Sequence, residues 1–405
     1  MISRIKFKNF KVFKEEQILD LRPITILIGK NNTGKSAVLK LPTLVEHALD
    51  DRDSLCIEYN NNGVVLGNDY KDLIYGKTFK ALDIEISQQN EHLDHLLLSI
   101  FIDHQANQPI LERWRLSQTA NNETKALLDL VYNGRGGEYT DECNSMVYRA
   151  GFEGWWLSHL FFVDKDGSET VPRQKFQLKT DFINGTRQTP KKGYYHNRNF
   201  GQSSGLEGEH LYDFLIQDYL TADQVFFRQV SNWVKDKFEG WELFINIDQE
   251  PYHVGLEKGQ LKINLSETGT GIGQSLPLIV RAVRPCQEPT LIIIEEPENN
   301  LHPCAHAQIA QLFADSIKKD NNKSYLFETH SLNFILRMRR LVAEGKMKKE
   351  DLAIYYVDFD EGKNASSLQR IYVDDGGGVD YWPEGVFSET TIETRAIYNA
   401  RQNNL

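Results

Sequence analysis

The sequence has 405 residues, of which 40% are hydrophobic and 25% are charged, so it is long enough to bury the cores of two lobes. Its formal net charge of -11 argues against a wholly basic nucleic-acid binder, because affinity for DNA depends largely on neutralising phosphates. No apolar run approaches the ~20 residues of a membrane helix, and the opening residues alternate like a strand rather than like a signal peptide. We therefore expect a cytoplasmic protein without membrane contact.

Residues 24–28 form an apolar run that leads directly into a glycine-rich segment. This order predicts a strand, a phosphate-binding loop and the start of a helix, which is the context of a P-loop and argues against a chance match on a glycine turn. Gly29 and Gly34 allow tight turns, so that backbone N–H groups and the positive end of the helix converge on phosphate oxygens. Lys35 is expected to reach the β- and γ-phosphates, and Ser36 to offer its hydroxyl to Mg²⁺. The expected nucleotide-binding residues here are Gly29, Lys30, Asn31, Asn32, Thr33, Gly34, Lys35, Ser36 and Ala37.

The next part of the chain alternates again at residues 82–86, which suits an antiparallel β-layer beside the nucleotide-binding sheet. From about residue 104 to 240 the sequence reads as irregular and aromatic, and we interpret it as an inserted lobe. Its later part, residues 209–238, places apolar side chains at helical spacing. No heptad pattern persists, so we expect no long coiled coil.

Residues 291–294 are apolar and run directly into Glu295 and Glu296. This pattern predicts a buried parallel strand that delivers carboxylates to the edge of a sheet where ligands bind; a solvated acidic loop would not explain the apolar run. Further on, residues 324–327 form another short strand before His330, which can hydrogen-bond the γ-phosphate or the attacking water. Glu296 is expected to polarise the attacking water as general base, and Glu295 to approach Mg²⁺ through water. The predicted catalytic residues are Glu296, His330 and Lys35, and the predicted metal ligands are Ser36 and Glu295.

These motifs in this order resemble the ABC-type ATPases of the SMC, RecF and OLD group. The resemblance is strongest to the small RecF-like AAA-family ATPases of bacterial antiphage defence systems, of the PARIS or Septu kind. Besides the P-loop and the acidic strand, the matching stretches are residues 5–13, 269–277, 300–303, 329–331 and 382–385. The resemblance implies an α/β fold: a P-loop ABC-type ATPase head with an antiparallel β-layer, an inserted mixed or helical lobe and no long coiled coil. The implied divisions are 1–103 for the N-terminal half of the head, 104–250 for the inserted lobe and 251–405 for the C-terminal half.

The resemblance also implies a composite site, in which each nucleotide lies between the P-loop of one head and a glycine-rich signature of a second head. Residues 269–275 resemble that signature, so Gly271, Gly273 and Gln274 are expected to contact the nucleotide of the partner. Gly273 stands where the family usually has serine, so the hydroxyl contact is lost, taken over by Ser275 or replaced by backbone N–H groups. Glu295 stands where many relatives carry aspartate, which a water-mediated metal contact tolerates.

The resemblance implies ATP and Mg²⁺ as cofactors and a homo-oligomer paired through its heads. The preferred interpretation is an ATP-hydrolysing switch that controls a separate effector, a nuclease or toxin, in antiphage defence. The alternatives are a RecF-like DNA-repair clamp and a scaffold that binds ATP but barely hydrolyses it. DNA contact would use one of the basic clusters, which are residues 4–14, residues 337–349, and Lys191, Lys192 and Arg198. Asp358 and Asp360 resemble a Toprim nuclease pair, but too little chain follows them for that domain.

Overall fold

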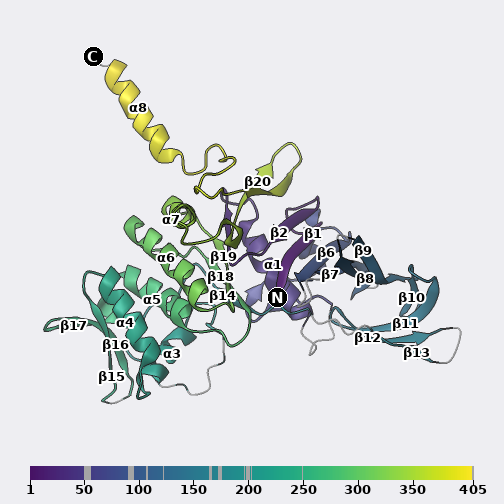
Figure 1. Ribbon diagram of the computed structural model, residues 1–405, viewed down its shortest axis with the longest axis horizontal. Coiled ribbons are helices and arrows are strands. Elements are labelled where there is room, and N and C mark those ends of the chain that lie inside the picture. The colour runs from purple at the N-terminus through teal and green to yellow at the C-terminus, as the bar shows by residue number, and fades with distance from the viewer. Residues whose placement is uncertain are drawn as a thin grey trace.

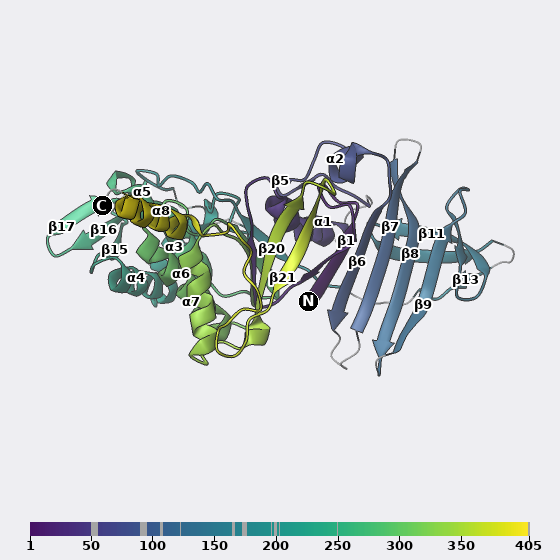
Figure 2. The same ribbon diagram turned by 90° about the horizontal axis from the view of Figure 1, so that it is seen from above.

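The computed structural model describes residues 1–49, 56–89, 95–105, 108–121, 123–163, 167–171, 176–195, 197, 201, 203–248 and 250–403. These residues form two main sheets with a mixed lobe of helices and a small sheet on one side (Figures 1 and 2). The order of elements agrees with the predicted fold class.

A six-stranded sheet carries the P-loop. Its strands are, in spatial order, β14 (Thr180–Ile183), β18 (Thr290–Glu295), β19 (Lys323–Glu328), β3 (Ile24–Ile28), β20 (Leu352–Asp360) and β21 (Ala365–Ile371). The first five strands are parallel, and β21 returns antiparallel to β20. In this register Glu295 lies opposite Glu328, and Glu328 lies opposite Leu27 at the end of the P-loop strand. The carboxyl edge of the sheet therefore brings together the end of β18 with its acidic residues, the end of β19, which His330 follows, and the P-loop after β3.

The sheet lies between two hydrophobic cores, which explains its continuous apolar runs. Leu27, Ile293 and Leu326 face one core, whereas their neighbours, such as Ile26 and Ile294, face the other. Helix α1 (Lys35–Ala48) packs on the first side, and α6 (Pro303–Lys319) and α7 (Leu332–Ala343) contribute to the second core. Because all five residues of β3 are buried, the P-loop starts from a fixed position.

An antiparallel sheet of ten strands extends from the other side of α1 (Figure 2). In spatial order these are β13 (Ser168–Glu169), β12 (Trp156–Phe162), β11 (Met146–Glu153), β10 (Glu138–Asp141), β9 (Glu123–Tyr132), β8 (Gln108–Ala120), β7 (His95–Gln105), β6 (Leu82–Gln89), β1 (Ile2–Lys8) and β2 (Gln17–Asp20). The expected β-layer is therefore present, but the residues after 104 that we expected to be irregular continue it. The predicted boundary between residues 103 and 104 falls inside β7. Trp114 and Trp155 are buried in the core beneath this sheet, where Trp114 Nε1 donates to the Trp155 carbonyl at 2.9 Å.

The mixed lobe contains α3 (His210–Tyr219), α4 (Val225–Lys237) and α5 (Thr270–Val283). A small sheet of β15 (Glu242–Asn246), β16 (His253–Lys258) and β17 (Leu261–Asn264) completes it. The longest helix of the described part of the chain, α6, has 17 residues, and no long coiled coil occurs there. Helix α8 (Glu389–Asn403) projects from the body at the C-terminal end (Figure 1).

Short elements connect these layers: β4 (Asn60–Asn61), β5 (Val64–Val65), α2 (Tyr70–Leu73), and the 3₁₀ turns η1 (Tyr75–Lys77), η2 (Leu265–Glu267) and η3 (Lys349–Asp351). A helix with the length and apolar character to cross a membrane does not occur among the described residues.

Candidate nucleotide-binding site

The P-loop has a backbone that requires glycine at both of its key positions. Gly29 has φ +153°, and a Cβ there would lie 2.4 Å from the carbonyl oxygen of Val357. Gly34 has φ +100°, and a Cβ there would lie 2.5 Å from Val12 Cγ2. Ser366 Oγ donates to the Thr33 carbonyl at 2.7 Å, so strand β21 also holds the loop. The loop is thus preformed by its neighbours.

The side chains of the loop divide into exposed and buried groups. Lys30, Asn31 and Asn32 are exposed, whereas Thr33 and Lys35 are buried. Lys35 Nζ donates to the Lys30 carbonyl at 2.8 Å, and burial lowers the pKa of its ammonium group. At the start of α1, the N–H of Ala37 donates to the Gly34 carbonyl at 3.1 Å, which begins the helix directly behind the loop.

Glu328 is a component of this site whose contact with the P-loop the sequence did not predict. Its Oε2 accepts a hydrogen bond of 2.8 Å from Ser36 Oγ, and its Oε1 lies 3.6 Å from Lys35 Nζ. Burial raises the pKa of the Glu328 carboxyl, and its contacts with Ser36 and Lys35 act in the opposite direction. Glu295, which is expected to approach the metal, accepts a hydrogen bond of 3.3 Å from the N–H of Gly185 through Oε2. The carboxylate bonded to Ser36 is therefore that of Glu328.

The predicted catalytic pair, Glu296 and His330, meets at the same edge. Glu296 Oε1 lies 3.8 Å from His330 Nε2, and Glu296 has φ +41°, a conformation that a non-glycine residue rarely adopts. Burial, together with the nearby charge of Lys35, lowers the pKa of His330. Glu298, buried behind them, accepts from the His330 N–H at 2.5 Å and from Thr329 Oγ1 at 2.8 Å. Glu298 thereby fixes the backbone that presents His330.

Arg187 connects the acidic strand to the start of α5, a role that no sequence motif indicated. Its buried guanidinium donates through Nη2 to the carbonyls of Glu295 at 2.9 Å and Glu296 at 2.8 Å. Burial lowers the pKa of Arg187 to about 10, although the acids around it oppose this shift. The Arg187 N–H donates to Gln274 Oε1 at 3.1 Å, and Gln274 Nε2 donates back to the Arg187 carbonyl at 2.9 Å. Arg187 thus links Gln274 of α5 to the residues at the end of β18 through hydrogen bonds.

The predicted signature residues separate into an exposed and a buried part. Gly269 is exposed at the N-cap of α5, and Gly271 is half-buried. Gly273 is buried, and a Cβ there would lie 2.5 Å from Pro190 Cγ, so packing explains why it is glycine. Gln274 is buried and bonded to Arg187, so neither Gly273 nor Gln274 is accessible to solvent. The exposed N–H groups at the start of α5 are those that a second molecule can reach.

Two predicted basic clusters are partly paired with acidic neighbours. In the first, Arg4 pairs with Asp20 at 2.6 Å and Lys6 with Glu85 at 3.2 Å. In the second, Glu344 pairs with Arg340 at 2.6 Å and with Lys346 at 2.7 Å. In the third, Lys191 and Lys192 are described, whereas Arg198 and the neighbouring His196 lie outside the described residues.

The Asp358 and Asp360 pair has local roles in a hairpin. Asp358 Oδ1 accepts from Tyr356 Oη at 3.0 Å, and Asp360 Oδ1 accepts from the Lys363 N–H at 3.0 Å in the turn between β20 and β21.

Comparison with known families matches three segments of the chain. Residues 1–142, which include the P-loop, match the family described as "AAA ATPase domain". Residues 215–337, which include α5, the acidic strand and His330, match the family described as "AAA domain, putative AbiEii toxin, Type IV TA system". Residues 347–397 match "Protein of unknown function (DUF3696)". Two of the three matched families are therefore AAA-type ATPase families, the second match includes most of the mixed lobe, and no curated protein matches the chain.

Among solved structures, similarity extends over 92% of this chain in each of three cases. The first is the SMC head domain from Thermotoga maritima, with 11% identity, a TM-score of 0.43 and 99% of that chain covered. The second is an SmcHead bound to the C-winged helix domain of ScpA, with 11% identity, a TM-score of 0.49 and 98% of that chain covered. The third is the Smc head domain with an extended coiled coil bound to the C-terminal domain of ScpA, derived from Pyrococcus furiosus, with 10% identity, a TM-score of 0.44 and 96% of that chain covered.

Proposed function

We propose that this protein is an ATP-hydrolysing switch whose heads pair around ATP to control a separate effector. The observation that carries the hydrolytic part is the meeting of Glu296 and His330, 3.8 Å apart, at the sheet edge that also holds Lys35. A carboxylate, a nearby imidazole and a P-loop lysine are the groups needed to orient water against a γ-phosphate. The matches to two ATPase-domain families, one over the P-loop and one over the acidic strand and His330, support the same interpretation.

The residues present fit ATP and Mg²⁺. The glycine-dependent cradle of residues 29–34 leaves backbone N–H groups and the start of α1 to receive phosphate oxygens. Mg²⁺ prefers oxygen ligands and usually takes one or two carboxylates together with substrate phosphates, and Ser36, Glu328 and Glu295 offer such oxygens. The metal would supply neutralisation of negative charge on the phosphates.

In the proposed mechanism, each side chain has a distinct task. Lys35 leaves the Lys30 carbonyl and its charge moves toward the β- and γ-phosphates. Glu296 accepts a proton from the attacking water as general base, while the neutral imidazole of His330 hydrogen-bonds the water or the γ-phosphate. The lowered pKa of His330, which burial causes, favours the neutral form of the imidazole. Arg187 holds the carbonyls of Glu295 and Glu296, so the base stays aligned.

The pairing of heads is supported by the position of α5. Helix α5 packs against α3, α4 and α6, whereas α1 packs against strands of the six-stranded sheet. Gly269 lacks a side-chain cap, so the first N–H groups of α5 remain open to an anion presented by a second copy. Closure of two heads would therefore place an anion against the start of α5. Because Gln274 bonds Arg187 and Arg187 bonds the Glu296 carbonyl, a shift of α5 would also move Glu296.

A separate effector and a role in antiphage defence form the remainder of the proposal. They rest on the resemblance of the motifs and on the second matched family, whose description names a toxin of a type IV toxin–antitoxin system. In such a pair, ATP-dependent closure and opening of the heads would hold or release the effector. The net charge of -11, together with the pairing of Arg4, Lys6 and Arg340 with carboxylates, does not favour DNA as the main partner.

The decisive experiment for hydrolysis is Glu296→Gln, which keeps the shape of the side chain but removes the base. Turnover of ATP should fall by ~10²–10⁴-fold, while binding of a fluorescent ATP analogue persists. Glu361→Gln, an exposed residue in the β20–β21 turn, is the matched control and should retain both. Retained turnover in the Glu296 variant would move the role of base to Glu295 or His330.

A further inference from the structure

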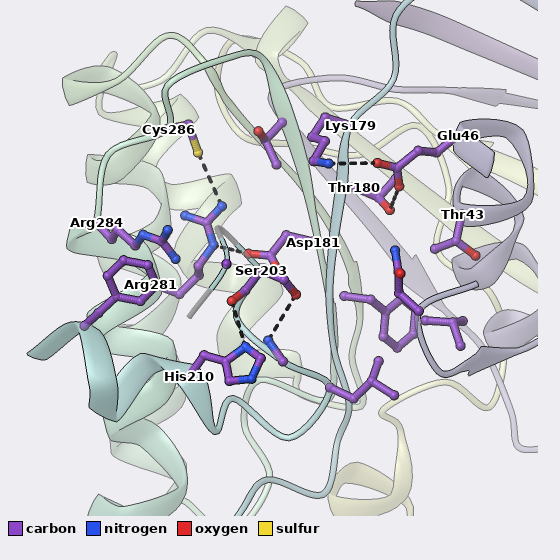
Figure 3. A pocket seen from close by; sticks show the side chains of 18 of the residues that line it. Thr43, Glu46, Lys179, Thr180, Asp181, Ser203, His210, Arg281, Arg284 and Cys286 are labelled. Atoms are coloured by element: carbon purple, nitrogen blue, oxygen red, sulfur yellow. Dashed lines mark hydrogen bonds and ion pairs between the residues drawn. The ribbon is translucent and has the colours of Figure 1, made fainter. Parts of the chain in front are cut away.

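A second cavity, of about 830 Å³, lies away from the P-loop. Its wall includes Thr180 and Thr290, the first residues of β14 and β18, so it lies at the amino ends of parallel strands. The P-loop follows the carboxyl end of β3 and so belongs to the opposite edge of this sheet. Figure 3 shows Arg281 and Arg284 on one side of the cavity, Thr43 and Glu46 on the other, and Asp181 between them. The cavity is therefore separate from the nucleotide site described above.

Two arginines at the end of α5 leave hydrogen-bond donors unused beside this cavity. Arg281 is only 3% exposed; its Nε donates to Asp181 Oδ2 at 2.5 Å and its Nη2 to Cys286 Sγ at 3.3 Å. The Arg284 guanidinium lies over the ring of Phe214. In both arginines Nη1 is buried and has no hydrogen-bond partner among the described residues. A buried donor without a partner costs about 1–3 kcal/mol, so an acceptor that reached these two atoms would be favourable.

The charges around the two arginines also favour an anion. Lys323, whose pKa is lowered to about 8 by burial and by Arg281, adds a third cation to the group. Asp181 is engaged by Arg281 and by Ser204, and Asp320 lies 3.7 Å from Lys323. Of these three cations, Arg284 is therefore the one without an ion pair among the described residues. On the far wall, Lys179 and Glu46 form their own pair at 3.7 Å.

Glu209 is a further carboxylate on the cavity wall, and it accepts from the N–H of Glu207 at 2.9 Å within its own loop. The charges that line the cavity balance, with Lys179, Arg281 and Arg284 against Glu46, Asp181 and Glu209, so an oxyanion would complement the guanidinium of Arg284 rather than a net positive charge.

We propose that this cavity binds a phosphate-bearing metabolite of nucleotide size, with its phosphate held by the guanidinium groups of Arg281 and Arg284. Guanidinium groups match phosphate geometry better than any other side chain. The cavity volume lies within the usual range for small-molecule sites and exceeds the needs of phosphate alone. Asn61 Oδ1, a buried acceptor of the cavity wall that also lacks a partner among the described residues, would accept from a donor on the base. Apolar surface from Val64, Phe182 and Leu206 would contact the flat ring.

The test uses AMP and inorganic pyrophosphate as probes in the Lys35→Ala protein, which lacks the P-loop charge. Calorimetric titration should show saturable binding of AMP, weakened about 10-fold or more by adding Arg284→Ala. Arg284→Lys keeps the charge but loses the planar guanidinium, so it should weaken binding less than Arg284→Ala. Because it is the more conservative change, it also controls for a loss of folding in the alanine variant. Arg228→Ala is the matched control, since Arg228 is exposed on α4 and does not line the cavity.

The two probes also test the orientation of the ligand. Asn61→Ala should weaken binding of AMP but not of pyrophosphate, because only AMP carries a base. The proposal would be overturned if neither probe bound saturably to the Lys35→Ala protein, or if both arginine variants bound as tightly as the Arg228 control. Because every arm uses the Lys35→Ala background, the outcome does not depend on whether the proposed ATPase activity exists.

Discussion

Ser36 donates a hydrogen bond of 2.8 Å to the carboxylate of Glu328, so the P-loop hydroxyl expected to meet Mg²⁺ is already paired with an acidic side chain. The same carboxylate lies 3.6 Å from the ammonium of Lys35, and both side chains are buried. An incoming triphosphate brings further negative charge to this point. The phosphates must therefore either displace the carboxylate or share a cation with it.

Replacement of Glu328 by threonine should reduce the dependence of ATP binding on Mg²⁺. The variant removes the carboxylate that repels the phosphates, so we expect ATP to bind about 10-fold more tightly in EDTA, with a smaller change in Mg²⁺. Equilibrium titration with a fluorescent ATP analogue under both conditions measures this. Glu328→Gln should behave similarly, because it removes the charge and keeps the shape. Equal Mg²⁺ dependence in all three proteins would show that Glu328 leaves nucleotide binding unaffected.

Replacement of Lys35 by alanine should abolish ATP binding and also destabilise the fold. Binding is lost because the point charge for the β- and γ-phosphates is removed. Stability falls because Glu328 keeps its buried charge without its partner, a change that costs about 3 kcal/mol in similar pairs. The double variant Lys35→Ala, Glu328→Gln should recover stability but not binding, as followed by denaturant unfolding and by titration. Unchanged ATP affinity in the single variant would contradict the P-loop assignment.

The sequence predicted the parts of the site that depend on local pattern. The P-loop, the acidic strand and His330 are each a short motif at a strand end, and parallel strands bring such ends to one edge. The role of Glu328 was missed because it depends on which strands are neighbours: β19 lies between β18 and β3 although it follows both in sequence. Arg187 was missed for the same reason, since its partners are backbone carbonyls 108 and 109 positions away.

The fold was predicted less well where apolar and polar residues do not alternate regularly along the strands. Residues 108–162 form long strands, but register shifts at Leu116 and Gly151 interrupt the alternation along β8 and β11. A shift of one residue moves every following side chain to the opposite face, so the hydrophobic pattern appears irregular in the sequence. Trp114 and Trp155 belong to the aromatic segment that we interpret as an inserted lobe, and they fill the core beneath the sheet.

Replacement of Arg187 by methionine should slow ATP hydrolysis while ATP still binds. Methionine retains apolar volume but loses the hydrogen bonds that hold the Glu295 and Glu296 carbonyls. A displacement of about 1 Å at a catalytic group can cost ~10²-fold in rate, so the effect should appear in turnover rather than in affinity. Steady-state ATPase assays with a parallel binding titration separate the two. A matched loss of affinity would instead indicate general disruption of the site.

The pKa of Lys323 predicts a pH dependence of stability. Its pKa is lowered from 10.5 to about 8 by burial and by Arg281, so between these values the unfolded chain holds more protons than the folded chain. The free energy of unfolding should therefore rise with pH from about 8 toward 10, by at most about 1.4 kcal/mol per pH unit. Lys323→Met should remove this rise, measured by denaturant unfolding at several pH values. An identical slope in the variant would assign the titration to another group.

The last prediction concerns the contact between two heads. Replacement of Gly271 by tryptophan should spare ATP binding but block closure and hydrolysis, because a bulky side chain would stand beside the exposed start of α5. A Cβ at this position already lies 3.1 Å from the Asn300 carbonyl, so the side chain must turn outward or shift that loop. ATP titration and steady-state turnover of the single variant test this first part.

Mixing the Gly271→Trp and Lys35→Ala proteins tests whether the site is shared between copies. In a heterodimer one site would carry both defects and the other neither, so activity should rise above that of either variant alone. Mixing Lys35→Ala with Ser36→Ala is the matched control, because both defects lie in the P-loop and every site then stays impaired. Subunit exchange is verified by energy transfer between labelled copies. Exchange without recovery of activity would contradict independent composite sites, since each heterodimer contains one complete set of groups.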